Sequence, residues 1–226
     1  MKYPNTAIFF DMDNTLIKSF IDYALMKSET VRLLRQYGLP PADEKMPVAK
    51  MMALAERDEK CTPEIAEAVW KRINEVEDAG LSLAVPENGA VDLLRRLSAD
   101  THILLLTNNV HASAAKTLER MGVMPYLSVY AGRGVVPALK PSPAGYQYLL
   151  NQLSPKVDFK SCLATGDALI DIQAASELGV DFIAYNGSRE EDWQRHSVMP
   201  RLYLRKWNDE AYRQICELLD EKNREG

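Results

Sequence analysis

Four aspartates in this chain follow apolar segments at positions where a carboxylate can take part in chemistry. Asp11 and Asp13 come directly after the run Ala7 to Phe10, and Asp167 and Asp171 follow a second such run. Carboxylates gathered at one place repel one another, and a divalent cation is the usual means of neutralising them. Because oxygen ligands favour magnesium over zinc, the four acids predict a Mg²⁺ site.

A hydroxyl, an amide and a cation accompany the acids. Thr107 and Asn108 follow the apolar run His102 to Leu106, and Lys140 lies in a loop further along the chain. Protein-bound magnesium usually keeps one or two carboxylates, several waters and a phosphate oxygen. The set therefore predicts a site for a phosphorylated ligand. The absence of a GxxxxGK[ST] sequence argues against nucleotide binding by a P-loop.

The segments before these residues read as buried strands alternating with helices. We expect strands at 7–10, 102–106, up to 130, 162–165, 180–185 and 201–204, and helices at 89–97, 112–121, 143–153, 169–178 and 209–223. This alternation predicts right-handed crossovers and a parallel sheet with helices on both faces. Ligands bind beyond the carboxyl ends of the strands in such sheets, where the polar residues are expected.

Between the first strand and the rest, the apolar spacing is helical. Residues 19–83 show apolar positions three, four or seven apart, and Thr62-Pro63 has the form of an N-cap followed by proline at the first helical position. We therefore predict an α/β protein with a Rossmann-like parallel sheet core, residues 1–17 and 86–226, and an inserted all-helical domain, residues 18–85.

Composition excludes several classes of protein. The 226 residues are 46% hydrophobic and carry a net charge of −5 with scattered basic residues, which argues against nucleic-acid binding. No apolar run reaches the length of a membrane span, and the N-terminus does not read as a secretory signal. Cys61, Cys162 and Cys216 show no metal-binding spacing, so we expect reduced cysteines and a cytoplasmic protein. Oligomeric state cannot be read from the sequence.

The polar residues form four motifs that resemble those of the haloacid dehalogenase superfamily of phosphatases and phosphotransferases. In order they are Asp11-Met12-Asp13-Asn14-Thr15, Thr107-Asn108, Lys140-Pro141 and Gly166-Asp167-Ala168-Leu169-Ile170-Asp171. The inserted helices resemble the all-helical cap of the branch that includes phosphoglycolate phosphatases and β-phosphoglucomutase. Two residues depart from the common pattern. Many relatives have glycine where this chain has Asn14, and serine or threonine where it has Ala168.

The resemblance implies a role for each residue. Asp11 would attack phosphorus and form an aspartyl-phosphate, and Asp13 would act as the general acid and base. Thr107, Asn108 and Lys140 would hold the phosphoryl group. The metal-binding set would be Asp11, Asp13 through its backbone carbonyl, Asp167, and Asp171 behind it.

The function expected from this resemblance is magnesium-dependent hydrolysis of a small phosphorylated metabolite beneath the cap. A phosphosugar mutase would use the same residues and return the phosphate to the sugar. A dehalogenase fits less well, because those relatives generally lack the second acid, present here as Asp13. A phosphate-binding relative without turnover is the third alternative, against which the intact Asp11 and Asp13 argue. The sequence does not identify the substrate.

Overall fold

The structure is a computed structural model that describes residues 1–40, 43, 45–186 and 199–225. The chain divides into two compact units. The core unit comprises Met1–Lys18 and Val85–Gly226, and the helical unit comprises Ser19–Ala84. That the helical unit acts as a cap stays a prediction.

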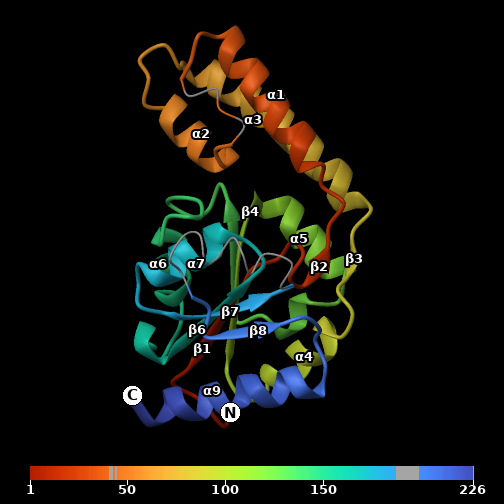
Figure 1. Ribbon diagram of the computed structural model, residues 1–226, viewed down its shortest axis with the longest axis vertical. Coiled ribbons are helices and arrows are strands. Elements are labelled where there is room, and N and C mark those ends of the chain that lie inside the picture. The colour runs from red at the N-terminus through yellow and green to blue at the C-terminus, as the bar shows by residue number, and fades with distance from the viewer. Residues whose placement is uncertain (41–42, 44, 187–198, 226) are drawn as a thin grey trace. The chain divides into compact units, whose positions relative to one another are not determined.

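The core unit is built on a six-stranded sheet in the order β5-β4-β1-β6-β7-β8 (Figure 1), whose pairs are all parallel. Its strands are β1 (Ala7–Phe10), β4 (His102–Val110), β5 (Val129–Arg133), β6 (Cys162–Gly166), β7 (Asp181–Tyr185) and β8 (Leu202–Leu204). In the described part of this unit the helices are α4 (Ala90–Leu97), α5 (His111–Arg120), α6 (Ala144–Leu150), α7 (Leu169–Ser176) and α9 (Asp209–Glu225), with short 3₁₀ turns at Met124–Tyr126 and Phe159–Ser161. They lie on both sides of the sheet, so the predicted α/β fold is confirmed.

The central strand β1 is buried on both faces. Successive strand residues point to opposite sides, so Phe9 and Phe10 meet different partners. The Phe9 ring stacks on Tyr146 of α6 with 4.5 Å between centroids, and Phe10 meets Trp207 edge to face at 6.2 Å. Burial of both faces explains why this strand reads as a continuous apolar run.

Two local features differ from the sequence-based expectation. Strand β4 extends to Val110, so Thr107 lies within the strand instead of after it, and its register with β5 shifts between Leu106 and Val110. The strands β2 (Ile17–Lys18) and β3 (Val85–Pro86) form an antiparallel pair. Two-residue strands are too short to show an alternation of apolar and polar residues, so this pair could not be predicted from the sequence pattern.

The helical unit consists of α1 (Tyr23–Gln36), α2 (Val48–Ala55) and α3 (Pro63–Ser82). The Thr62 hydroxyl accepts a hydrogen bond from the backbone N–H of Ile65 at 3.4 Å, which confirms the predicted N-cap. Val31 of α1 and Ile73 of α3 are buried, in keeping with the helical spacing of apolar residues. Among the described residues, no helix combines the length and the apolar character needed to cross a membrane.

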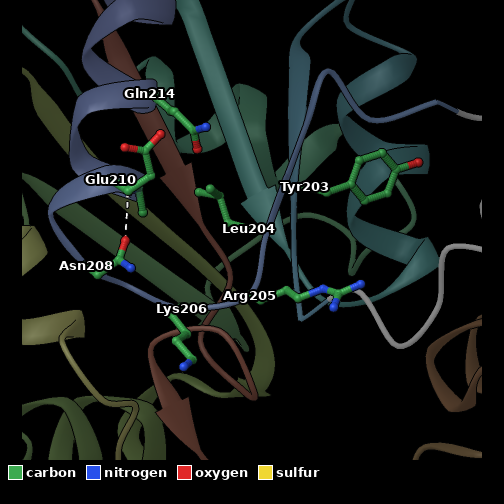
Figure 2. Close-up of a pocket in the computed structure, with 8 residues that line it drawn as sticks. Tyr203, Leu204, Arg205, Lys206, Asn208, Glu210 and Gln214 are labelled. Atoms are coloured by element: carbon green, nitrogen blue, oxygen red, sulfur yellow. Dashed lines mark hydrogen bonds between the residues drawn. The ribbon is translucent and has the colours of Figure 1, made fainter.

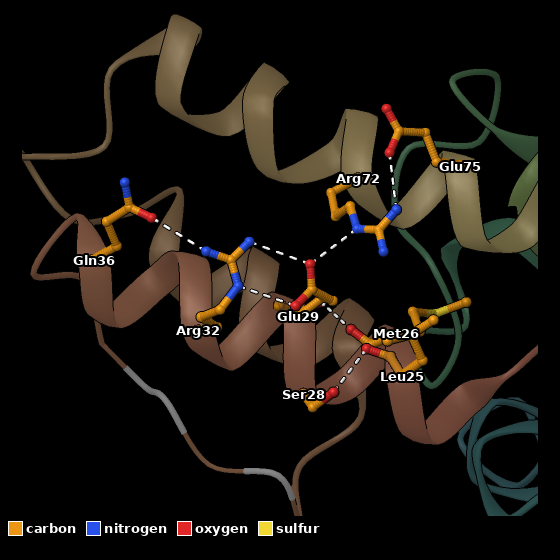
Figure 3. Close-up of polar contacts among 9 residues, drawn as sticks. Leu25, Met26, Ser28, Glu29, Arg32, Gln36, Arg72 and Glu75 are labelled. Carbon is orange, nitrogen blue, oxygen red and sulfur yellow. Dashed lines mark hydrogen bonds and ion pairs between the residues drawn. The ribbon is translucent and has the colours of Figure 1, made fainter.

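An ionic cluster joins the two long helices of this unit (Figure 3). Glu29 of α1 accepts hydrogen bonds from Arg32 at 3.0 Å and from Arg72 of α3 at 2.9 Å. Arg72 also binds Glu75 at 3.0 Å, and Arg32 reaches the Gln36 side chain at 3.4 Å. The Glu29 carboxylate therefore links α1 to α3.

We expect Glu29 to make the stability of the helical unit pH-dependent in acid. Hydrogen bonds from Arg32 and Arg72 lower the pKa of Glu29 from 4.5 to about 2. A depressed pKa means that the stabilisation is present above pH 4.5 and is lost as the pH falls toward 2. Glu29→Gln should remove this dependence, as measured by circular dichroism during thermal unfolding at several pH values. Glu67→Gln, on the exposed side of α3, is the control, and parallel losses in wild type and Glu29→Gln would contradict the prediction.

Candidate active site

Three of the predicted acids lie together at the carboxyl edge of the sheet. Asp11 follows β1, Asp167 follows the neighbouring strand β6, and Asp171 lies in the first turn of α7. One carboxylate oxygen from each lies within 4.8 Å of the other two, close enough for all three to approach one cation. Adjacent parallel strands deliver their carboxyl ends to one edge, which explains why residues 156 positions apart in the chain (11 and 167) meet.

Lys140 is buried among these acids, with 1% of its surface exposed. Its ammonium group donates to Asp11 Oδ1 at 2.5 Å, to Asp171 Oδ1 at 2.6 Å and to the Leu106 carbonyl at 3.0 Å. Burial by itself would lower the pKa of Lys140, but the two carboxylates outweigh it and hold the pKa well above 10.5. Lys140 is therefore a fixed positive charge.

The site has fewer positive charges than negative ones. Burial raises the pKa of Asp11 well above its ordinary value, and Lys140 opposes that rise while Asp171, Asp13 and Asp167 add to it. Among the residues that the structure describes, one lysine thus faces four carboxyl groups, and a divalent cation would supply the missing positive charge. Since the donors are all oxygens, this set of residues fits Mg²⁺.

Asp171 connects the lysine to the start of α7. Its Oδ1 accepts from Lys140, and its Oδ2 accepts from the backbone N–H of Ala168 at 3.1 Å. The carboxylate fits because position 166 is glycine: a Cβ added to Gly166 would lie 2.5 Å from Asp171 Oδ2. The alanine at position 168 removes a side-chain hydroxyl but keeps the backbone donor that Asp171 uses.

Asp13 lies in the turn after β1 and has a partner that we did not single out from the sequence. Its Oδ2 accepts a 2.6 Å hydrogen bond from the side-chain amide of Asn109, and both residues are buried. Asn109 lies two residues after Thr107 on β4, and side chains two apart on a strand point to the same face. That spacing was the signal available in the sequence. In the same turn, Asn14 has a φ of 54°, a conformation that asparagine tolerates better than most residues.

Asn108 has a different contact from the predicted one with phosphate. Its Nδ2 donates to the Lys140 carbonyl, and its Oδ1 accepts from the Lys140 backbone N–H, each at 2.9 Å. The side-chain amide thus fixes the backbone of the lysine loop. Thr107 is buried and its hydroxyl accepts from the backbone N–H of Asn109 at 3.2 Å. Contact of either residue with phosphate stays a prediction.

A pocket of about 290 Å³ lies at a different place in the core unit, between the end of β8 and the start of α9 (Figure 2). Its wall includes Tyr203, Arg205, Lys206 and Gln214, and it contains none of the predicted site residues. The acid cluster around Lys140 is therefore the better candidate for the active site.

Comparison with known proteins agrees with the fold and the motifs. A phosphoglycolate phosphatase from Neisseria gonorrhoeae is 27% identical over 187 residues, which cover 76% of this chain and 76% of the relative. Among solved structures, a protein from Bacillus subtilis assigned as a hydrolase of the superfamily, bound to magnesium, matches with a TM-score of 0.60 at 18% identity over 95% of this chain and 98% of its own. A protein assigned as a β-phosphoglucomutase from Thermotoga maritima matches with a TM-score of 0.57 at 20% identity, over 95% and 98% of the two chains.

The sequence model of one protein family matches most of the chain. The haloacid dehalogenase-like hydrolase profile aligns with residues 6–179, a range that includes all four motifs, the whole helical unit and the core unit as far as Gly179. The parallel sheet, the order of the motifs and this match agree, and the chain belongs to the haloacid dehalogenase-like hydrolase family.

Proposed function

We propose that this protein is a magnesium-dependent phosphatase that hydrolyses a small phosphomonoester through an aspartyl-phosphate on Asp11. The observation that carries the proposal is the contact of the Lys140 ammonium with Asp11 and Asp171, beside Asp167. A buried nucleophilic carboxylate held by a cation, in an acidic cluster that fits Mg²⁺, suits attack on a phosphoryl group. Relatives named phosphoglycolate phosphatase support the same reaction class.

The first half of the reaction forms the covalent intermediate. A carboxylate oxygen of Asp11 attacks phosphorus, the bond from phosphorus to the ester oxygen breaks, and Asp13 gives its proton to the departing alkoxide. The amide of Asn109 holds the Asp13 carboxyl from one side, so that the group faces the leaving oxygen in a fixed orientation. Lys140 holds the Asp11 carboxyl in place and favours its ionised form, against the burial that raises its pKa. A bound divalent cation would favour the ionised form further.

The second half returns the enzyme to its starting state. Asp13, now a carboxylate, takes a proton from water as the water attacks the aspartyl-phosphate, and phosphate leaves Asp11. Lys140 and the Thr107 hydroxyl would stabilise charge on the phosphoryl oxygens during both transfers. A magnesium ion held by Asp11, Asp167 and the Asp13 carbonyl would supply charge stabilisation and orientation. Asp171 we assign to holding Lys140, since its two oxygens already accept from Lys140 and from Ala168.

The relatives and the helical unit support a proposal for the class of substrate. The 27% identical relative is named for phosphoglycolate, a two-carbon phosphomonoester, and we propose a substrate of that size. The helical unit, Ser19–Ala84, would serve as the cap that excludes bulk water while Asp11 is phosphorylated and opens for exchange.

A phosphosugar mutase is the second candidate, because the fold also matches a protein assigned as a β-phosphoglucomutase. Such an enzyme would use Asp11 in the same way but return the phosphoryl group to another hydroxyl of the sugar. The product separates the two reactions: a phosphatase releases inorganic phosphate, whereas a mutase yields an isomer of the sugar phosphate.

Phosphate release from phosphoglycolate, sugar phosphates and nucleoside monophosphates tests the proposal. We expect hydrolysis of a small phosphomonoester with Mg²⁺ present and its loss on chelation with EDTA, restored by added Mg²⁺. Calcium at the same concentration is a control for ionic strength and charge. Unchanged turnover after exhaustive chelation would contradict the magnesium requirement. Absence of phosphate release from every compound, with isomer formation from a sugar phosphate, would favour the mutase.

Asp13→Asn should slow hydrolysis of an alkyl phosphate by roughly 100- to 10,000-fold, the usual contribution of a general acid or base. Asparagine keeps the size of the side chain but can neither give nor take the proton. With 4-nitrophenyl phosphate, whose leaving group needs little protonation, the variant should release one rapid equivalent of nitrophenol and then turn over slowly, because the intermediate accumulates. Stopped-flow absorbance measures this burst. A uniform loss without a burst would contradict the assignment of both roles to Asp13.

A further inference from the structure

Trp207 lies far from the acids in the sequence yet contacts the turn that carries Asp13. Its indole N–H donates a 2.7 Å hydrogen bond to the backbone carbonyl of Thr15, 192 residues away along the chain. Only 4% of the Trp207 surface is exposed, so this is a buried hydrogen bond. A buried donor with a single strong acceptor holds that acceptor in place, because breaking the bond leaves both groups without water.

The turn that receives this bond determines where Asp13 lies. Backbone hydrogen bonds from Leu16 and Ile17 to the Met12 carbonyl close the turn, and the N–H of Asn14 donates to the Ile17 carbonyl at 2.6 Å. Asp13 is held within the turn and pairs with Ile17 as an isolated bridge. The backbone of this general acid and base is therefore positioned by the turn.

Asp11 is held by a different set of contacts. Its backbone N–H donates to the Thr165 carbonyl of β6 at 2.9 Å, so the sheet itself fixes its position. A displacement of the turn would thus affect Asp13 more than Asp11. Loss of the Trp207 contact should therefore impair proton transfer by Asp13 more than nucleophilic attack by Asp11.

The indole of Trp207 is held in place by two aromatic neighbours. Tyr185 of β7 stacks on it with 4.1 Å between centroids and an angle of 7°, and Phe10 of β1 meets it edge to face. The Tyr185 hydroxyl donates to the Glu87 carboxylate at 3.1 Å, and the Glu87 backbone N–H donates to the Leu16 carbonyl at 2.9 Å. The aromatic pair thus contacts both the turn and the segment that leads into α4.

Gly89 makes room for this arrangement. It has a φ of 82°, and an added Cβ would lie 2.0 Å from the Trp207 carbonyl oxygen. Two segments more than a hundred residues apart therefore meet backbone to backbone beneath the turn, with the indole directed at Thr15.

We propose that Trp207 is a positioning residue for catalysis, which holds Asp13 in place through the Thr15 carbonyl. The inference rests on the proposed phosphatase function for its kinetic consequence. Its structural consequence, a less rigid turn over residues 12–17 when the hydrogen bond is removed, does not depend on any activity.

The test is Trp207→Phe, which keeps an aromatic ring beside Tyr185 but removes the indole donor. We expect kcat/KM for phosphoglycolate to fall about tenfold, the size of one lost buried hydrogen bond, and kcat/KM for 4-nitrophenyl phosphate to change less than about twofold. An alkoxide requires the proton from Asp13 and nitrophenolate does not. Hydrogen–deuterium exchange of the amides of Asn14, Leu16 and Ile17 should become faster.

The matched control is Trp70→Phe, which removes another indole hydrogen bond, the one to Glu56 on the surface of the helical unit. It should change neither the ratio of the two kcat/KM values nor exchange in the turn. If Trp207→Phe does not fold, β-(3-benzothienyl)alanine at position 207 replaces the N–H by sulfur and keeps the bicyclic shape.

Equal losses on the two substrates, or unchanged exchange in the turn, would overturn the proposal. If the wild-type protein released no phosphate from any of the phosphomonoesters tested, the proposed function would fail. The exchange measurement would then still decide whether Trp207 holds the turn.

Discussion

Asp11→Asn should abolish turnover on every phosphomonoester that the wild-type protein hydrolyses. The amide cannot attack phosphorus, so no covalent intermediate forms, and the loss exceeds the range expected for removal of a general acid. The substitution is nearly isosteric and removes one charge from an overcrowded acidic cluster, so the variant should remain folded. Phosphate release and mass spectrometry of the protein quenched during turnover measure the two effects: wild type gains a phosphoryl group and the variant does not.

Asp92→Asn is the matched control for this prediction. Asp92 is on the surface of α4, where it pairs with Arg95, and its substitution should leave both turnover and phosphorylation unchanged. Substantial activity of pure Asp11→Asn, or a phosphorylated residue other than Asp11 in the wild type, would refute the assignment of the nucleophile.

Lys140→Met should lower both stability and activity. The ammonium group has three buried partners, Asp11, Asp171 and the Leu106 carbonyl, and methionine has nearly the same length without the charge. Removing one partner of a buried ion pair typically costs about 3–5 kcal/mol, since it leaves uncompensated charge behind. Urea denaturation without added metal measures the free energy of unfolding, and phosphate release measures the loss of activity, which we expect to exceed 100-fold.

Lys222→Met offers a comparison for this variant. Lys222 of α9 is also largely buried and pairs with Asp181 at 2.8 Å, at the start of β7, whereas the acid cluster lies at the carboxyl edge of the sheet. We expect a smaller loss of stability, because Asp181 keeps its second partner Arg201, and no loss of activity. An equal effect of both substitutions on activity would contradict a specific role for Lys140.

Much of the architecture could be predicted because it depends on local pattern. The buried run of β1 is apolar at every position, and the helix that starts at Pro63 has its cap and its proline in adjacent positions. The same holds for the acids, since carboxylates directly after strands must come to the edge of a parallel sheet. Residues Asp11, Asp167, Asp171 and Lys140 accordingly lie together.

The positioning contacts could not be predicted in this way. The amide of Asn108 holds the Lys140 backbone, the amide of Asn109 holds Asp13, and Trp207 holds the Thr15 carbonyl. Asparagine and tryptophan are common on protein surfaces and in cores, and the position of such a residue in the chain does not reveal which distant group its side chain contacts. The pairing of β2 with β3 could not be predicted either, because a strand of two residues is too short to show the alternation of apolar and polar residues.

The sequence by itself determined the chemical groups, their order and the sheet edge at which they are presented, since strand periodicity and residue type act over a few neighbouring positions. The tertiary structure alone decided how each group is oriented and which of its hydrogen-bonding atoms are already occupied. Orientation depends on contacts between residues such as 15 and 207, which only the packing of the folded chain brings together.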